Sequence, residues 1–126
     1  METITNIIKT LNNIYKKQNP KGTGEFQVEC FSNTYVLEHV EYKEIRLEFT
    51  FIKRHEDPYI ILQFMYKIRL SEWNEDIIMN NIYSQFLEEL IRFMLFAKDT
   101  DNLRDSENNP LCIKFIQTLI RKENGK

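Results

Sequence analysis

Acidic residues near the C-terminal end of the chain are spaced closely enough to suggest a calcium-binding loop. They are Asp99, Asp101, Asp105 and Glu107. An EF-hand loop that begins at Asp99 needs an oxygen ligand at its fifth position, glycine at its sixth and glutamate at its twelfth. Those positions hold Leu103, Arg104 and Pro110. We therefore predict that residues 99–109 form a solvated polar loop between two helices and bind no metal.

Other residues with catalytic or metal-binding side chains also lack a suitable context. His39 and His55 have no second histidine or cysteine at the spacing of metal ligands. Cys30 and Cys112 form no CxxC pair, so we expect reduced, buried thiols. No serine or cysteine lies in a recognisable nucleophile motif. The sequence therefore predicts no catalytic residue, no metal ligand and no cofactor.

Glu41-Tyr42-Lys43 is the one short pattern that suggests an enzyme. It resembles the (Asp/Glu)-x-Lys element of the restriction-endonuclease-like nucleases, whose α-β-β-β-α order is also similar to the order predicted below. In such sites two carboxylates hold Mg²⁺ and a lysine orients the attacking water. The resemblance implies these roles for Glu41 and Lys43, with Glu29 or Glu38 as the second carboxylate. A metal-dependent nuclease is therefore an alternative hypothesis for the function.

A β-hairpin over residues 44–70 is the element around which the rest of the chain is arranged. Its first half alternates polar residues with Ile45, Leu47, Phe49 and Phe51. In its second half, every second residue from residue 60 onward is apolar: Ile60, Leu62, Phe64, Tyr66, Ile68 and Leu70. Because side chains alternate across a strand, each half has one continuous apolar face. The polar residues 53–58 end in Asp-Pro, which favours a turn between the two strands.

Helical spacing of apolar residues predicts three helices, over residues 4–18, 74–98 and 110–122. The last is expected to begin at Asn109-Pro110, with proline at its first position. Residues 25–30 and 35–40 are expected to be extended, with a turn at residues 32–34 and a bulge near residues 43–44. The prediction is one α+β domain, residues 1–126, in the order α-β-β-β(-β)-α-α. Its antiparallel meander sheet has three or four strands, and residues 123–126 form a frayed tail.

Composition limits the class of function. The 126 residues carry a net charge of −2, which argues against strong non-specific nucleic-acid binding. No apolar run approaches the roughly 20 residues of a membrane span, and no signal peptide is visible, so we expect a cytoplasmic protein. Isoleucine and asparagine are abundant, whereas Ala97 is the only alanine. This bias indicates an AT-rich coding genome, such as that of a low-GC bacterium or its phages.

The order helix–three strands–helix also resembles that of double-stranded-RNA-binding domains. Those domains place lysines at the start of their last helix, where they contact phosphates. The corresponding residues in this chain are Glu72, Glu75 and Asp76, which would repel phosphate. Direct nucleic-acid binding is therefore an alternative that the sequence does not favour.

The outer face of the hairpin provides the candidate interface. Its predicted residues are Arg46, Tyr59, Ile61, Met65, Lys67 and Arg69. Tyrosine, methionine and arginine among polar residues are typical of protein interfaces. Either this face is a binding surface, or helix 110–122 covers it. We predict a non-enzymatic module that binds another protein, such as an inhibitor or accessory factor from a phage or mobile element that acts on a host protein. A homodimer is compatible with the same sequence.

Overall fold

Three antiparallel strands form an open meander sheet with the spatial order β1-β2-β3. The computed structural model describes residues 2–96, 103–105, 107–111 and 113–124. Its strands are β1 (Glu25–Leu37), β2 (Val40–Ile52) and β3 (Tyr59–Arg69). Its helices are α1 (Glu2–Gln18), α2 (Glu75–Phe96) and α3 (Ile113–Asn124), with a short 3-10 turn, η1 (Leu70–Glu72), before α2. The predicted α+β order is confirmed, and the sheet has three strands.

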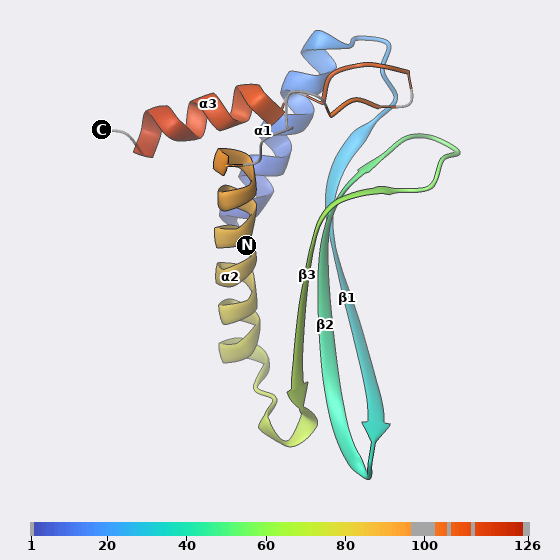
Figure 1. The fold of residues 1–126 in the computed structure, drawn as a ribbon, viewed down its shortest axis with the longest axis vertical. Coiled ribbons are helices and arrows are strands. Elements are labelled where there is room, and N and C mark those ends of the chain that lie inside the picture. The colour runs from blue at the N-terminus through green and yellow to red at the C-terminus, as the bar shows by residue number, and fades with distance from the viewer. Residues whose placement is uncertain (1, 97–102, 106, 112, 125–126) are drawn as a thin grey trace.

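All three helices lie on the same side of the sheet (Figure 1). α2 runs alongside the strands, and α3 packs against α2, where Arg121 donates a hydrogen bond of 2.7 Å to the Leu95 carbonyl oxygen. The core residues from α1 and α2 are Ile4, Leu11, Tyr15, Ile78, Ile82, Phe86, Leu90 and Met94. They pack on the β2 residues Ile45, Leu47, Phe49 and Phe51. We call this side the helix face; the opposite side, the open face, is covered by none of the described elements.

The first hairpin departs from the prediction at residues 32–34. β1 passes through them in unbroken register with β2, with Asn33 opposite Glu44. The chain turns instead at Glu38 and His39, whose φ angles are 50° and 67°. Positive φ at both central residues is characteristic of the two-residue hairpin turn whose twist matches that of the paired strands. Because neither residue is glycine, strand pairing and not local turn preference determines where this hairpin turns.

The prediction of a bulge near residues 43–44 is wrong, because β2 keeps an unbroken register there with both neighbouring strands, and a bulge lies in β3 instead. Phe49 pairs with Leu62 whereas the next residue, Thr50, pairs with Ile60, so Ile61 is an extra residue in β3. One extra residue reverses which side chains of the strand point to which face. The parity of β3 before Ile61 is therefore opposite to its parity after it.

The helices lie where the sequence predicts them, with differences at both ends of α3. Asn74 caps α2, because its Oδ1 accepts a hydrogen bond of 3.2 Å from the backbone N–H of Ile77. α3 begins at Ile113 and not at Pro110, because Pro110 forms an isolated antiparallel bridge with Arg104 within the loop of residues 103–111. α3 continues to Asn124, two residues beyond its predicted end at residue 122.

Some predictions concern residues outside those that the structure describes. These are the end of helix 74–98 at residues 97–98, residues 99–102 and 106 of the loop, residues 125–126 of the tail, and Cys112. Cys30 is described, and the prediction that it is buried is wrong. It is an exposed free thiol, because it lies on β1 at the edge of the sheet.

Candidate functional site

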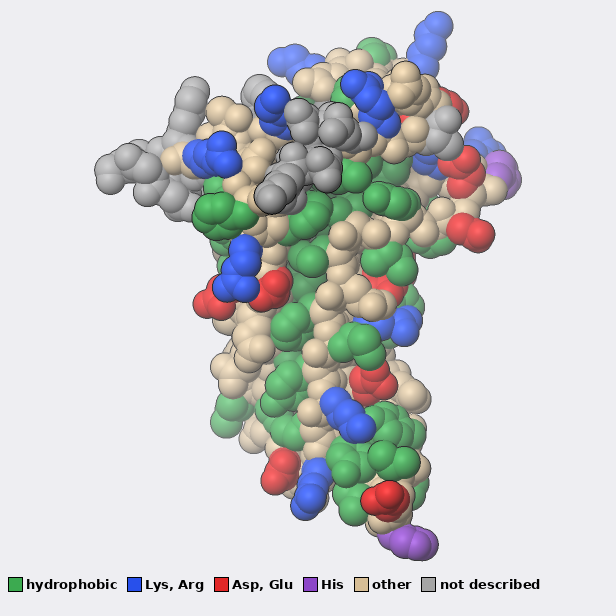
Figure 2. Space-filling view, viewed as in Figure 1, with side chains coloured by type: hydrophobic (Ala, Val, Ile, Leu, Met, Phe, Trp, Pro, Cys, Tyr) green, Lys and Arg blue, Asp and Glu red, His purple; other side chains and the backbone are tan. Residues whose placement is uncertain are grey.

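The open face presents rows of three side chains, one from each strand. From the β1–β2 turn inward, the rows are Tyr35–Tyr42–Arg69, Asn33–Glu44–Lys67, Phe31–Arg46–Met65 and Glu29–Glu48–Gln63. Residues directly opposite one another point to the same face of a sheet. We call the aromatic, cationic and methionine members of the first three rows the open-face patch: Phe31, Tyr35, Tyr42, Arg46, Met65, Lys67 and Arg69. Figure 2 shows hydrophobic side chains at the end of the sheet that carries the β1–β2 turn, at the bottom of the view, with Lys or Arg side chains beside them.

Cationic groups lie over aromatic rings within the open-face patch. The Lys67 ammonium is 4.7 Å from the centre of the Tyr42 ring and 5.3 Å from that of Tyr35. These two rings stack with their centres 5.7 Å apart. A hydrogen bond to Tyr35 raises the pKa of Lys67, so this group is cationic at neutral pH. The Arg46 guanidinium lies 4.6 Å from the centre of the Phe31 ring. Such contacts hold the cations in place while they stay at the surface.

The patch combines exposed apolar area with positive charge. Phe31 is 39% exposed and Met65 is 56% exposed. Arg46 forms an ion pair with Glu48, with 3.3 Å between Arg46 Nε and Glu48 Oε2. Arg69 is exposed and has no ion pair within the part of the chain that the structure describes. Chemically, this arrangement can bury apolar groups of a partner and pair with its carboxylates.

Four of the six residues predicted as an interface lie in this patch, namely Arg46, Met65, Lys67 and Arg69. Tyr59 does not, because beyond the bulge it pairs with Phe51 and so belongs to the helix face. Ile61 is the bulged residue itself and packs, half-buried, against the core. The prediction that all six residues share one face is therefore wrong. Their role in binding stays a prediction.

Three aromatic residues of the patch are not predicted from the sequence, namely Phe31, Tyr35 and Tyr42. The predicted turn at residues 32–34 divided β1 and hid the relation between Phe31 and Tyr35. These two residues share one parity of an uninterrupted strand. That alternation is the signal that places them together, but it can be used only if β1 is continuous.

The residues of the nuclease hypothesis are partly separated by the sheet. Glu41 and Lys43 share the helix face near the β1–β2 turn, and the Lys43 ammonium lies 4.4 Å from the centre of the Trp73 ring. Glu29 pairs with Glu48 on the open face, so it cannot converge with Glu41. Glu38 lies in the turn and remains the candidate for the second carboxylate. No cluster of three or more metal-binding side chains occurs among the described residues.

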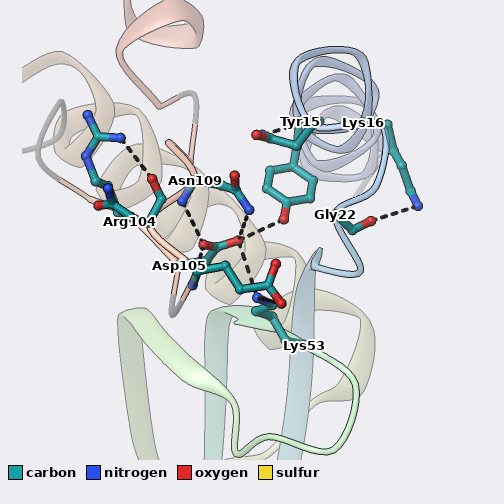
Figure 3. A network of polar contacts seen from close by, with 10 residues as sticks. Tyr15, Lys16, Gly22, Lys53, Arg104, Asp105 and Asn109 are labelled. Atoms are coloured by element: carbon teal, nitrogen blue, oxygen red, sulfur yellow. Dashed lines mark hydrogen bonds and ion pairs between the residues drawn. The ribbon is translucent and has the colours of Figure 1, made fainter.

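A buried polar cluster lies at the other end of the sheet, where α1, the end of β2 and the loop of residues 103–111 meet (Figure 3). The Asp105 side chain is 0% exposed. It accepts hydrogen bonds from the Tyr15 hydroxyl at 2.9 Å and from the backbone N–H of Asn109 at 2.8 Å. The Lys53 ammonium is 3.6 Å from Asp105 and 3.1 Å from Glu107. Burial raises the pKa of Asp105, but the hydrogen bonds from Asn109 and Tyr15 outweigh burial and hold this pKa below its ordinary value.

A cavity of about 550 Å³ opens beside this cluster. Phe51 and Leu111 form its apolar part, and its polar lining includes His55, Asp57 and Arg104. The lining carries charges of both signs, and two of its residues, Lys53 and Asp105, are already paired with one another. The cavity therefore defines no particular class of ligand. We infer that the polar cluster fixes the loop of residues 103–111 to the sheet.

Alkaline pH should destabilise the protein through Tyr15. Burial and the hydrogen bond to Asp105 raise the pKa of Tyr15 from 10.0 to about 12. Because the folded state favours the neutral phenol, this contribution is fully present below about pH 10 and is lost as the pH rises towards 12. Two pKa units correspond to roughly 2–3 kcal/mol. Urea denaturation from about pH 8 to 12 should show a smaller alkaline loss for Tyr15→Phe than for the unmodified chain. Parallel pH profiles for the two proteins would contradict this prediction.

Any inference about the function of this protein rests on its fold and its surface. Neither a protein-family model, nor a curated protein, nor a solved structure matches this chain. Among the helices that the structure describes, none combines the length and the apolar character that a bilayer span requires.

Proposed function

We propose that the protein is a non-enzymatic binding module that engages an acidic surface of another protein with the open face of its sheet. The main support is the position of the three helices on one side, which leaves the open-face patch outside the described core. Arginine, tyrosine and methionine are enriched at the centres of protein interfaces. The AT-rich coding bias favours a phage or mobile element as the source and a host protein as the partner.

The arrangement of charges suggests how the partner would be oriented. Lys67 and Arg69 lie near the β1–β2 turn, where Glu44 is opposite Lys67, whereas Glu29 and Glu48 lie farther along the same face. A partner with carboxylates opposite Lys67 and Arg69 would gain charge complementarity at that end. Its apolar side chains would then cover Met65. The open face of the sheet thereby sets both the position and the direction of the bound partner.

Truncation of Arg69 tests the proposal. Arg69→Ala should weaken binding by about 30-fold or more, since an interface hot spot is worth about 2 kcal/mol or more. Folding should change by no more than about 0.5 kcal/mol, because the side chain is exposed. A photo-crosslinking residue in place of Met65 would identify the partner in lysate of a low-GC bacterium. Calorimetry with the purified partner would then measure the affinity.

Arg92→Ala is the matched control for this test. Arg92 is an exposed arginine on α2, paired with Glu89 on the same helix at 3.1 Å. It lies in the helix layer and not on the open face. Its truncation should leave affinity unchanged. If Arg92→Ala and Arg69→Ala weaken binding equally, or if neither does, the open face is not the binding site.

Single-stranded nucleic acid is the second candidate ligand, because exposed aromatic rings beside cations can stack bases and contact phosphates. Phe31 and Lys67 are the residues of the patch that favour it. Fluorescence anisotropy with labelled oligonucleotides distinguishes the two candidates. Binding through phosphates should weaken steeply between about 50 and 200 mM salt. Affinity that hardly changes over this range would remove phosphate contacts as the basis of binding.

A further inference from the structure

The outer edge of β1 is a long strand edge that pairs with no other described segment. At its start, Asn12 of α1 occupies the edge. The Phe26 N–H donates to Asn12 Oδ1 at 2.6 Å, and Asn12 Nδ2 donates to the Phe26 carbonyl oxygen at 3.0 Å. Asn12 thus makes both hydrogen bonds that a residue of a neighbouring strand would make. Backbone groups of alternate residues point to the same edge of a strand. Beyond Phe26, those that point outward belong to Val28, Cys30, Ser32, Thr34 and Val36.

The other edge strand, β3, carries the features that normally discourage strand addition. A bulge at Ile61 interrupts its ladder. Lys67 and Arg69 place charge along its final part, and Pro58 comes directly before its first residue. Charges, bulges and proline are the usual means by which proteins protect a free sheet edge.

β1 has no bulge and no proline, and it carries little charge. Its register with β2 is continuous from Glu25 to Leu37. Residues 27–37 contain neither lysine nor proline, and Glu29 is their only charged residue. Val36 is 63% exposed and Leu37 is 50% exposed. A long, regular and largely uncharged edge of this kind is suited to pairing with another strand.

We propose that two copies of this chain pair antiparallel through their β1 edges, about a two-fold axis at Ser32, and join their sheets into one. The free edge runs from residue 27, just past the Asn12 contact, to residue 37, just before the turn. Ser32 is the midpoint of this segment, so this register pairs its whole length. Such an interface is isologous, with the same surface contributed by both copies. The homodimer is independent of the open-face proposal, because it uses the strand edge.

The apolar contacts of this register are complementary. It places Val36 of the second copy opposite Val28, on the helix face. A groove of about 510 Å³ lies there between α1 and the start of β1, and its lining includes Ile4, Ile8 and Val28. The groove leaves room beside the strand for an incoming side chain. Burial of the exposed Val36 in this groove would remove apolar surface from water in both copies.

The charges are complementary in the same register. Glu29 of one copy comes opposite Tyr35 of the second copy, on the open face. The Tyr35 ring is the one that holds the Lys67 ammonium at 5.3 Å. Each carboxylate therefore approaches a cation of the other copy, and no like charges are opposed along residues 27–37. This pairing favours a second copy over an unrelated strand.

Measurement of the oligomeric state tests the proposal. Light scattering after size exclusion, with the full chain at roughly 1–100 μM, should show the mass of two chains at the higher concentrations. Ser32→Pro should give a monomer, because it removes an outward-pointing N–H from the strand edge without breaking a bond to β2. Val36→Lys should also give a monomer, since it places a charge at the groove. This second variant changes an exposed side chain, so it tests the interface even if the proline variant fails to fold.

Ile77→Lys is the matched control, because Ile77 is also an exposed β-branched residue, at 63%, but lies on α2. This variant should remain a dimer. The register is tested by Thr34→Cys in a Cys112→Ser background, since the introduced thiol should then face Cys30 of the second copy and form a disulfide with it under mild oxidation. A monomeric chain at every concentration would overturn the proposal. A dimer that persists in both edge variants, or that forms no such disulfide, would do the same.

Discussion

Asp105→Ala should lower the free energy of unfolding by about 3–5 kcal/mol, because it leaves the buried Lys53 ammonium without its buried carboxylate partner. Asp105 also accepts the hydrogen bonds of Tyr15 and Asn109, which would lose their acceptor. A native domain has only about 5–15 kcal/mol of stability in total. Thermal unfolding monitored by circular dichroism should therefore show a midpoint lower by roughly 10–20 °C.

Glu107→Ala provides the matched control for Asp105→Ala. Both carboxylates pair with the ammonium of Lys53, but the Glu107 side chain is 62% exposed whereas that of Asp105 is 0% exposed. Exposed ion pairs contribute about 0–1 kcal/mol. Glu107→Ala should therefore have a small effect. If the two variants lose equal stability, burial of the Asp105 cluster does not determine its contribution.

The second hairpin and α2 could be predicted from the sequence because their signals are local. The alternation of Leu47, Phe49 and Phe51 identifies β2 and the side chains that it packs against the helices, and the structure confirms both. The helical spacing of apolar residues identifies α2, because this period is read from residues within a few turns of one another. Neither inference needs knowledge of which segments meet in space.

The first hairpin could not be placed by local signals. Ser32-Asn33-Thr34 has the composition of a turn, whereas Glu38-His39, where the chain actually turns, does not. Cross-strand pairing over the whole of β1 decides between them. The bulge at Ile61 is hidden for the same reason, since the apolar alternation from Ile60 onward has no visible break. Tyr59 was consequently assigned to the wrong face.

The buried polar cluster depended on contacts between distant segments. Tyr15 and Asp105 are 90 residues apart in the chain, yet they share a hydrogen bond of 2.9 Å. From the sequence, Asp105 was one carboxylate in an acidic, solvated loop. Only the packing of the loop of residues 103–111 against α1 and the end of β2 buries it. Within the open-face patch, the alternation of side chains along β2 and β3 predicted the cationic residues, whereas the aromatic residues of β1 could not be predicted.

Phe26→Ala should cost about 3–5 kcal/mol in the free energy of unfolding, as expected for a large side chain removed from a closely packed core. Phe26 is 1% exposed, and its ring centre lies 4.9 Å from that of Phe51 and 5.7 Å from that of Phe49. Phe31 is the matched control, since it is the same residue type on the same strand but lies on the open face. Phe31→Ala should cost less than about 1 kcal/mol, most of it from the contact with Arg46. Urea denaturation of both variants at one protein concentration makes the comparison. A reversed order of the two losses would mean that β1 presents its other face to the helices, and the open-face patch would then lose Phe31 and Tyr35.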